Sequence, residues 1–462
     1  MAKLTDFSKT IVALATALGT GSIAVIRISG IDAIKVVNTM FHSIDLQKVD
    51  ANTIHFGRIS NNDYEIDQVL VSVFRAPHSY TGEDYVEISC HANPFIVDEV
   101  IDLLIKHGAV PAKNGEFSLR AFLNGKMDLI QAEAVAGTIS AKSKKGMHNS
   151  LLSLEGALSV RIKKIHEKLI DILSNLELDL DFSEEEIDII SPDQIEKSIK
   201  SILVMIDKLI RGYNYGKLLH SGLNVAIIGK PNVGKSTLMN VLLGENRAIT
   251  SPTPGTTRDI VSENLVLDQI SLKLIDTAGL RAASNNIEAE GVRRTETQIS
   301  ISDIVLFILD ISKRCSKSDI ELIKNIINRY NVRPILIGNK IDLGKNNKAV
   351  ENINSLHLPF VQISAKHKTN LDALKLEIKK LVSEEYQKTN DEIVISNLRH
   401  KNILERVKGS LLNAKISAKD AKGFEFVALD VREALESLGE ITGETATDDI
   451  LNHIFSNFCI GK

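Results

Sequence analysis

The sequence contains only 3 cysteines and no excess of basic residues, and each scarcity excludes a class of protein. Cys90, Cys315 and Cys459 form neither a disulfide framework nor a spacing typical of zinc sites, as expected in a reducing compartment. The net charge of −4 gives no global basic field for nucleic acid, so RNA would have to bind a local patch. The candidates for that patch, which a solvated helix face explains at least as well, are Lys142, Lys144, Lys145, Arg161, Lys163 and Lys164.

Long apolar runs are also missing, and no stretch of the sequence is long enough to span a bilayer. Residues 11–18, which follow Lys3 and Lys9, resemble a short secretory signal. However, Asp6 interrupts the basic region, and residues 22–29 continue as an amphipathic strand. We therefore expect a cytoplasmic protein without a membrane partner.

The most informative stretch is GKPNVGKS at residues 229–236, which follows a β-type apolar run and precedes a helical pattern. Its glycines allow backbone N–H groups to point toward phosphate oxygens, and the helix N-terminus adds a favourable partial charge. Lys235 is expected to reach the β- and γ-phosphates, and the Ser236 hydroxyl is expected to bind Mg²⁺. The stretch predicts a site for a nucleoside triphosphate.

Three later segments, each after a predicted strand, narrow the nucleotide to GTP. In DTAG, Asp276 can hold Mg²⁺ through water and the Gly279 N–H can meet the γ-phosphate. In NKID, the Asp342 carboxylate can accept two hydrogen bonds from guanine, a pair that adenine does not offer. The sequence SAK at residues 364–366 would place a backbone N–H on the guanine O6.

The predicted GTP-binding residues are Asn232, Val233, Gly234, Lys235, Ser236, Thr237, Ser251, Pro252, Thr253, Pro254, Gly255, Thr256, Thr257, Asp276, Thr277, Ala278, Gly279, Asn339, Lys340, Asp342, Ser364, Ala365 and Lys366.

A length of 462 residues corresponds to about three domains, and the hydrophobic pattern divides the sequence into four segments. Residues 1–120 combine short β-type runs with an apolar helical pattern at 95–107 and predict an α+β domain. Residues 121–215 are helical, residues 216–382 form the α/β P-loop GTPase domain, and residues 383–462 are helical again. This order indicates a GTPase domain inserted into an all-α helical domain.

Details of the first helical segment are also predicted. Asp128 is a predicted N-cap, and one long amphipathic helix is expected at about residues 150–180. Ser183 and Glu186 form a predicted capping box for the next helix. That helix is expected to end before residues 211–216, because the sequence RGYNYG breaks the pattern.

Motifs outside the GTPase segment are SYTGED at residues 79–84, GEFSLRAFLNGK at residues 115–126 and CIGK at residues 459–462. Together with the embedded GTPase, they resemble the MnmE (TrmE) family of tRNA-modification GTPases over essentially the full length. The resemblance implies a homodimer that works with an MnmG-type flavoprotein, as a heterotetramer, on the wobble uridine of certain tRNAs. The group added at C5 would be an aminomethyl or carboxymethylaminomethyl substituent.

The resemblance also implies a cofactor, 5-formyltetrahydrofolate or a related reduced folate, which donates the one-carbon unit. The N-terminal domain would bind it with a fold similar to folate-dependent aminomethyltransferases, and the family dimerises through this domain. The implied folate-binding residues are Arg27, Glu87, Lys126 and Lys462. For Glu83 and His91, two polar residues nearby, a structural role is the simpler interpretation.

An apolar helical pattern precedes Cys459, and we expect it to anchor residues 459–462 so that they project toward the folate pocket. The residues of that pattern are Ile450, Leu451, Ile454, Phe455 and Phe458. Cys459 is a candidate nucleophile by position alone, and a thiol needs a lowered pKa to act in this way.

The hydrolytic residues follow mainly from the resemblance. Leu280 stands where Ras-type GTPases carry a glutamine that orients water, so another group must do so. The family places its catalytic carboxylate at Glu288. No arginine finger is evident, although Arg258 and Arg281 are candidates, and Lys235 is the phosphate-loop lysine of the predicted catalytic set.

The family uses K⁺ in place of an arginine finger, because a cation beside the β–γ bridge neutralises the charge that develops on the leaving oxygen. The implied K⁺ ligands are Asn232, Ser251, Thr253 and Thr256. Thr257 would be the second Mg²⁺ ligand beside Ser236.

Two alternatives stay open at this point. One is a ribosome-assembly or RNA-binding switch GTPase without modification chemistry, although no basic RNA-binding domain is visible. The other is an N-terminal domain that only dimerises and has lost folate binding.

Overall fold

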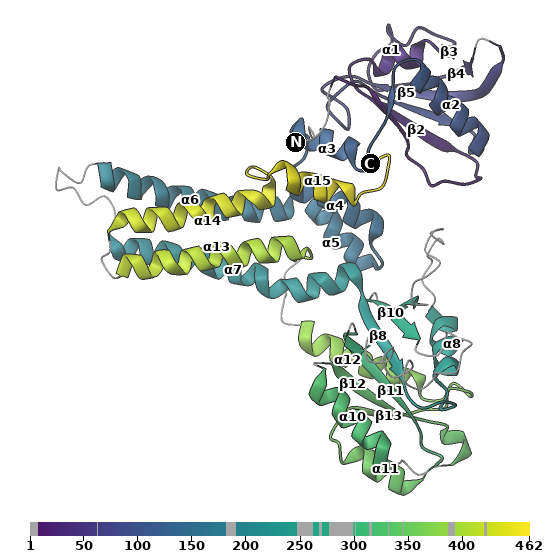
Figure 1. Cartoon of the computed structure of the whole chain (residues 1–462), viewed down its shortest axis with the longest axis vertical. Coiled ribbons are helices and arrows are strands. Elements are labelled where there is room, and N and C mark those ends of the chain that lie inside the picture. The colour runs from purple at the N-terminus through teal and green to yellow at the C-terminus, as the bar shows by residue number, and fades with distance from the viewer. Residues whose placement is uncertain are drawn as a thin grey trace, which may run out of the picture. The chain divides into compact units, whose positions relative to one another are not determined.

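The computed structural model describes residues 8–61, 63–181, 191–246, 262–267, 270–276, 299–300, 302–313, 317–330, 332–344, 346–386, 393–419 and 423–462. Figure 1 shows the elements along the chain. Contacts divide the chain into two units. The first comprises Met1–Ala136, Leu152–Val204 and Asn402–Lys462, and the second comprises Gly137–Leu151 and Met205–Lys401.

A seven-stranded sheet, in the order β3-β4-β5-β6-β2-β1-β7, begins the first unit. Its strands are β1 (Ile11–Leu14), β2 (Ala24–Ser29), β3 (Phe41–His42), β4 (Thr53–Ser60), β5 (Glu65–Phe74), β6 (Tyr85–Cys90) and β7 (Val110–Pro111). All neighbouring pairs are antiparallel except β1 and β7. The segment that resembled a secretory signal therefore contributes β1, a strand between two others.

Alternation along the strands decides which face of this sheet is buried. In β5, Val69, Val71 and Val73 are buried, whereas Leu70 between them is exposed. The helices α1 (Ala33–Asn38) and α2 (Pro94–Lys106) contribute further residues to the same core. This arrangement confirms the predicted α+β fold of the N-terminal segment.

Helices make up the rest of the first unit, and four of them, α4, α5, α7 and α13, also contribute residues to the second. They are α3 (Glu116–Leu123), α4 (Leu129–Ser140), α5 (Lys144–Leu154), α6 (Ala157–Asp181), α7 (Pro192–Ser221), α13 (Leu398–Lys419), α14 (Phe424–Thr442) and α15 (Asp448–Ser456). The helices α6 and α14 lie side by side in Figure 1, and Arg432 forms an ion pair with Glu177 at 2.6 Å across them. Asp128 caps α4 as predicted, because its Oδ1 accepts the backbone N–H of Gln131 at 2.8 Å.

Two predictions for the helices are wrong. The expected helix at 150–180 is two helices, since α5 ends at Leu154 and Gly156 has a φ of +90° before α6 begins. The helix expected to end before residues 211–216 instead continues as α7 to Ser221. The predicted capping box of Ser183 and Glu186 lies outside the described residues.

The continuation of α7 has a packing cause. A Cβ at Gly216 would lie 2.1 Å from the backbone oxygen of Ile395, so a glycine is needed where the two backbones meet. Tyr213 is buried, and the ammonium of Lys401 lies 5.2 Å from the centre of its ring. The sequence RGYNYG is therefore a packing surface within a helix, and the predicted domain boundary after residue 215 falls inside α7.

Asn149 of α5 joins the same part of the second unit. Its Nδ2 donates to the backbone oxygen of Val394 at 3.1 Å, and its Oδ1 accepts the Val394 N–H at 3.0 Å. Both atoms of a buried side-chain amide are thus paired with one residue of the segment that precedes α13.

A six-stranded sheet, in the order β13-β12-β11-β8-β10-β9, forms the centre of the second unit. Its strands are β8 (Leu223–Ile228), β9 (Ser262–Leu267), β10 (Ile270–Asp276), β11 (Ile304–Asp310), β12 (Arg333–Asn339) and β13 (Phe360–Gln362). Every pair is parallel except β9 and β10. Its helices include α8 (Lys235–Asn246), α10 (Lys317–Arg329), α11 (Asn347–Asn354) and α12 (Leu371–Tyr386), with a 3₁₀ turn at Ile341–Leu343.

Both faces of this sheet are buried, as expected of a parallel sheet between helices. Along β11, Ile304, Leu306 and Ile308 belong to one hydrophobic core. Val305 and Phe307 of the same strand belong to another. Among the described residues, no helix has both the length and the apolar character needed to cross a membrane.

The close approach at Gly216 predicts that alanine changes the stability of the protein in opposite directions at Gly216 and at Gly244. Gly216→Ala should destabilise the protein by about 1–3 kcal/mol, because the new methyl group would overlap the Ile395 backbone oxygen. Gly244→Ala is the matched control in α8, since nothing lies within 4 Å of its added Cβ. That control should instead stabilise the helix by about 0.5–1 kcal/mol. Urea unfolding followed by circular dichroism measures both, and equal effects would contradict the packing explanation.

Candidate functional site

The phosphate loop lies between the end of β8 and the start of α8, and two glycines define its path. A Cβ at Gly229 would lie 2.4 Å from the Ile308 backbone oxygen, and one at Gly234 would lie 2.3 Å from the Asn339 Nδ2. Gly234 also has a φ of +102°, a region that side chains rarely allow. The loop therefore passes so close to β11 and to Asn339 that only glycine fits at these positions.

Lys235 begins α8 and directs its ammonium back across the loop. Its Nζ donates to the backbone oxygens of Gly229 at 2.8 Å and Lys230 at 2.9 Å. Ser236 and Thr237 follow in the first turn of α8, where backbone N–H groups lack partners within the helix. A lysine ammonium beside a helix N-terminus is suited to bind phosphate.

Asn339 connects the phosphate loop to the segment that contains Ser364 and Ala365. Its Nδ2 donates to the Val233 backbone oxygen at 2.8 Å, and its Oδ1 accepts the Ala365 N–H at 2.9 Å. The residue is 3% exposed, so both bonds lie in the protein interior. Three motifs that are far apart in the sequence thus meet at one edge of the sheet.

Asp342 lies beside this junction. Its Oδ1 accepts the Ser364 hydroxyl at 2.6 Å, and its Oδ2 lies 3.8 Å from the His367 Nε2. The hydrogen bond from Ser364 is the main reason why the pKa of Asp342 is lowered from its ordinary value. The carboxylate is therefore ionised at neutral pH and can accept hydrogen bonds from a base.

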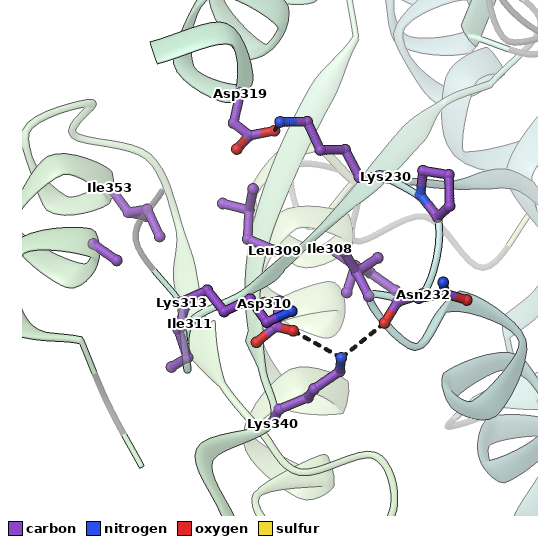
Figure 2. Close-up of a pocket in the computed structure, with 13 residues that line it drawn as sticks. Lys230, Asn232, Ile308, Leu309, Asp310, Ile311, Lys313, Asp319, Lys340 and Ile353 are labelled. Atoms are coloured by element: carbon purple, nitrogen blue, oxygen red, sulfur yellow. Dashed lines mark hydrogen bonds and ion pairs between the residues drawn. The ribbon is translucent and has the colours of Figure 1, made fainter. Parts of the chain in front are cut away.

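Lys340 makes a second connection to the phosphate loop, shown in Figure 2. Its Nζ donates to the Asn232 backbone oxygen at 2.8 Å and pairs with the Asp310 Oδ2 at 2.7 Å. No sequence motif identifies Asp310. Its only signal is its position as the last residue of the apolar strand β11, at the edge where the other motifs lie.

Burial raises the pKa of Asp310, but hydrogen bonds from Lys340 and Ser312 outweigh burial and bring it below its ordinary value. Asp310 lines a pocket of about 270 Å³, together with Lys230 and Asn232. In the same pocket, Lys230 forms an ion pair with Asp319 at 2.8 Å.

Several predicted site residues lie outside the described residues: Ser251, Pro252, Thr253, Pro254, Gly255, Thr256, Thr257, Thr277, Ala278, Gly279, Arg281 and Glu288. Arg258 and Leu280 also lie outside them. Asp276 is the last residue of β10 and pairs in parallel register with Ile227 of β8. Lys366 follows Ala365 directly in the segment that Asn339 holds.

A second group of predicted residues lies on the N-terminal sheet. Arg27 of β2 is opposite Glu87 of β6, and the two side chains form an ion pair at 2.9 Å. The Tyr85 hydroxyl, which no sequence motif identifies, donates to the same Glu87 oxygen at 3.1 Å. Burial raises the pKa of Tyr85, so this hydroxyl stays protonated.

The segment that carries Lys462 reaches this ion pair. Arg27 donates to the Gly461 backbone oxygen at 3.2 Å, and a Cβ at Gly461 would lie 2.3 Å from the Leu14 backbone oxygen. Burial and the Arg27 charge lower the pKa of Lys462. The structure thus brings Arg27, Glu87 and Lys462 together, whereas Lys126 donates to the Pro77 backbone oxygen at 3.0 Å.

The expected anchoring of this segment is confirmed. Leu451, Ile454, Phe455 and Phe458 are buried in one cluster, with Ile450 packed against it. Cys459 is exposed, and its backbone oxygen accepts the Lys462 N–H at 3.3 Å.

The two polar residues for which structural roles were preferred both have structural partners. Glu83 accepts two hydrogen bonds from the fully buried Arg120, each at 3.1 Å. The His91 ring pairs with Asp67 at 2.7 Å.

Comparison with known proteins matches nearly the whole chain. Residues 10–126 match the family described as the GTP-binding protein TrmE N-terminus, and residues 129–459 match the MnmE helical domain. The protein named tRNA modification GTPase MnmE from Flavobacterium johnsoniae is 40% identical over 461 residues, which is 98% of this chain and 99% of that protein. The protein of the same name from Carboxydothermus hydrogenoformans is 41% identical over 460 residues, with 98% and 99% covered.

The position of Asp342 predicts a change of base specificity. In Asp342→Asn, the acceptor pair for guanine is lost, so affinity for GTP should fall by roughly 10- to 100-fold, as expected for hydrogen bonds to a charged group. Affinity for xanthosine triphosphate should rise, because the new amide can donate to the oxygen that replaces the guanine amine. Fluorescence titration with both nucleotides measures the exchange, and unchanged GTP binding would refute the role of this motif.

Proposed function

Because this chain belongs to the MnmE family of tRNA modification GTPases, we propose that it hydrolyses GTP while it modifies C5 of the wobble uridine of tRNA. The observation that carries this proposal is the identity of about 40% over nearly all of both chains. Two local arrangements support it. One is the junction of phosphate loop, Asn339 and Asp342, and the other is the approach of Gly461 to Arg27.

We place a reduced folate such as 5-formyltetrahydrofolate at Arg27, Glu87 and Lys462, with Lys126 as a further candidate. The residues suit this group, because the two cations would receive its carboxylates and formyl oxygen, and Glu87 would accept from the donor edge of the pteridine. The Arg27–Glu87 pair already fixes both side chains relative to each other. When bound, the folate supplies the one-carbon unit.

In the GTPase site, Lys235 and the N-terminus of α8 would bind the phosphates, and Ser236 with Thr257 would hold Mg²⁺. Asn232 would bind K⁺, together with oxygens of Ser251, Thr253 and Thr256. Glu288 would orient the attacking water, and Arg281 would add positive charge. The K⁺ would supply positive charge that stabilises the transition state, as an arginine finger does.

The proposed assembly is a homodimer that joins an MnmG-type flavoprotein as a heterotetramer and acts on tRNA. The cytoplasm is the proposed location of this reaction. Cys459, exposed beside the proposed folate site, is the candidate nucleophile of the modification step.

The proposed cation site predicts hydrolysis that depends on K⁺. Phosphate release at equal ionic strength should be fast in KCl and slow in NaCl, because Na⁺ is too small for a site with K⁺ distances. Asn232→Ala should abolish most of the difference between the salts by removing a ligand. Equal rates of the wild-type protein in the two salts would refute the cation mechanism.

Docking of residues 459–462 predicts that modification and hydrolysis can be separated. Gly461→Ala should abolish tRNA modification, because its methyl group would overlap the Leu14 backbone oxygen and displace Lys462. Deletion of residues 459–462 should do the same, and intrinsic GTP hydrolysis should stay nearly unchanged in both variants. Cys459→Ser distinguishes loss of the thiol from loss of docking.

Nucleoside mass spectrometry and phosphate release together measure these variants. Loss of both activities in Gly461→Ala would show that the segment has only a structural role.

A further inference from the structure

Among the described residues that are predicted to bind GTP, two with side chains adopt left-handed backbone conformations, and they are bonded to each other. Asn232 in the phosphate loop has a φ of +63°. Lys340 in the base loop, which comprises residues 339–342, has a φ of +69°. The Lys340 Nζ donates to the Asn232 backbone oxygen at 2.8 Å. Such conformations persist only where surrounding contacts fix them, and they cluster at ligand sites.

Asp310 is a second partner of the same Lys340 ammonium. Its Oδ2 pairs with the Lys340 Nζ at 2.7 Å, and the side chains of Asp310 and Lys340 are 13% and 28% exposed. Its Oδ1 accepts the Ser312 hydroxyl at 2.5 Å and the Ser312 N–H at 3.1 Å. Both oxygens of the carboxylate are therefore engaged, and the one that faces Lys340 has a fixed direction.

The register of the sheet gives this contact its position. Asp310 of β11 is paired with Asn339 of β12, the residue immediately before Lys340. Asn339 already donates to the Val233 backbone oxygen, so the two loops are connected at two successive residues on each side. Only the second connection depends on a charged partner, and charge-assisted hydrogen bonds are the stronger kind.

We propose that Asp310 is a positioning residue for guanine nucleotide binding, which holds the Lys340 ammonium on the Asn232 oxygen and so joins the base loop to the phosphate loop. Opening the base loop would then require the Lys340 bonds to break, and Asp310 slows release of the nucleotide. This inference rests on the proposed function, because it assumes that the site binds guanine nucleotides.

A double-mutant cycle with Lys340 tests the proposal by the rate at which a fluorescent GDP analogue is released in a stopped-flow instrument. Asp310→Asn keeps the size of the side chain and removes its charge, and it should accelerate release about tenfold, as expected for loss of one charge-assisted hydrogen bond. In the background of Lys340→Met, the same substitution should change the rate by less than about twofold, because its partner is already absent.

Two further variants complete the design. Asp372→Asn is the control for loss of a carboxylate, since Asp372 is 98% exposed and pairs only with Lys375 on α12 among the ion pairs that the structure describes. It should release the analogue at the wild-type rate. Ser312→Ala removes only the hydroxyl that directs Asp310. It should accelerate release by a few-fold when Lys340 is present, and should have no such effect in the Lys340→Met background. It keeps the test decisive if Asp310→Asn does not fold.

The outcomes separate this inference from the proposed function. If Asp310→Asn and Ser312→Ala release the analogue at the wild-type rate, the inference is overturned but the proposed function is not. Equal acceleration by Asp310→Asn with and without Lys340 would also overturn the inference, because a general structural role of Asp310 would give that result. A wild-type protein that does not bind the GDP analogue would refute the proposed GTP site, and the inference with it.

Discussion

Parallel pairing of β8 with β10 and β11 is the constraint on which the nucleotide site depends. Parallel strands end at the same edge of a sheet, so residues that follow them meet there regardless of their distance in the sequence. Here that edge collects the phosphate loop after β8, Asp276 at the end of β10 and Asp310 at the end of β11. Pairing of β11 with β12 adds Asn339, which binds the phosphate loop and the segment of Ala365.

At the N-terminal sheet, the second group of site residues also depends on contacts of the backbone. The segment of residues 459–462 is held by a buried cluster around Phe455 and Phe458, and it ends against Arg27. Gly461 permits this approach, because any side chain there would meet the Leu14 backbone oxygen. The ion pair of Arg27 with Glu87 depends in turn on the register of β2 and β6.

The sequence predicted those parts of the site whose geometry is set locally. The phosphate loop requires its glycines and lysine within a few residues, so GKPNVGKS identifies the loop without knowledge of its neighbours. Asp310 had no such pattern, because its partner Lys340 comes from another strand and only the sheet register brings the two together. Gly216 was misinterpreted as a helix break for the same reason, since the backbone that requires it belongs to Ile395. The roles of Glu288 and Thr257 rest on the family resemblance and stay predictions.

We propose above all that this GTPase modifies the wobble uridine of tRNA. Mass spectrometry of tRNA nucleosides from cells that lack the protein tests it most directly. We expect the C5-modified wobble uridine to disappear and to return when the wild-type protein is restored. An unchanged level of the modified nucleoside in cells without the protein would contradict the claim.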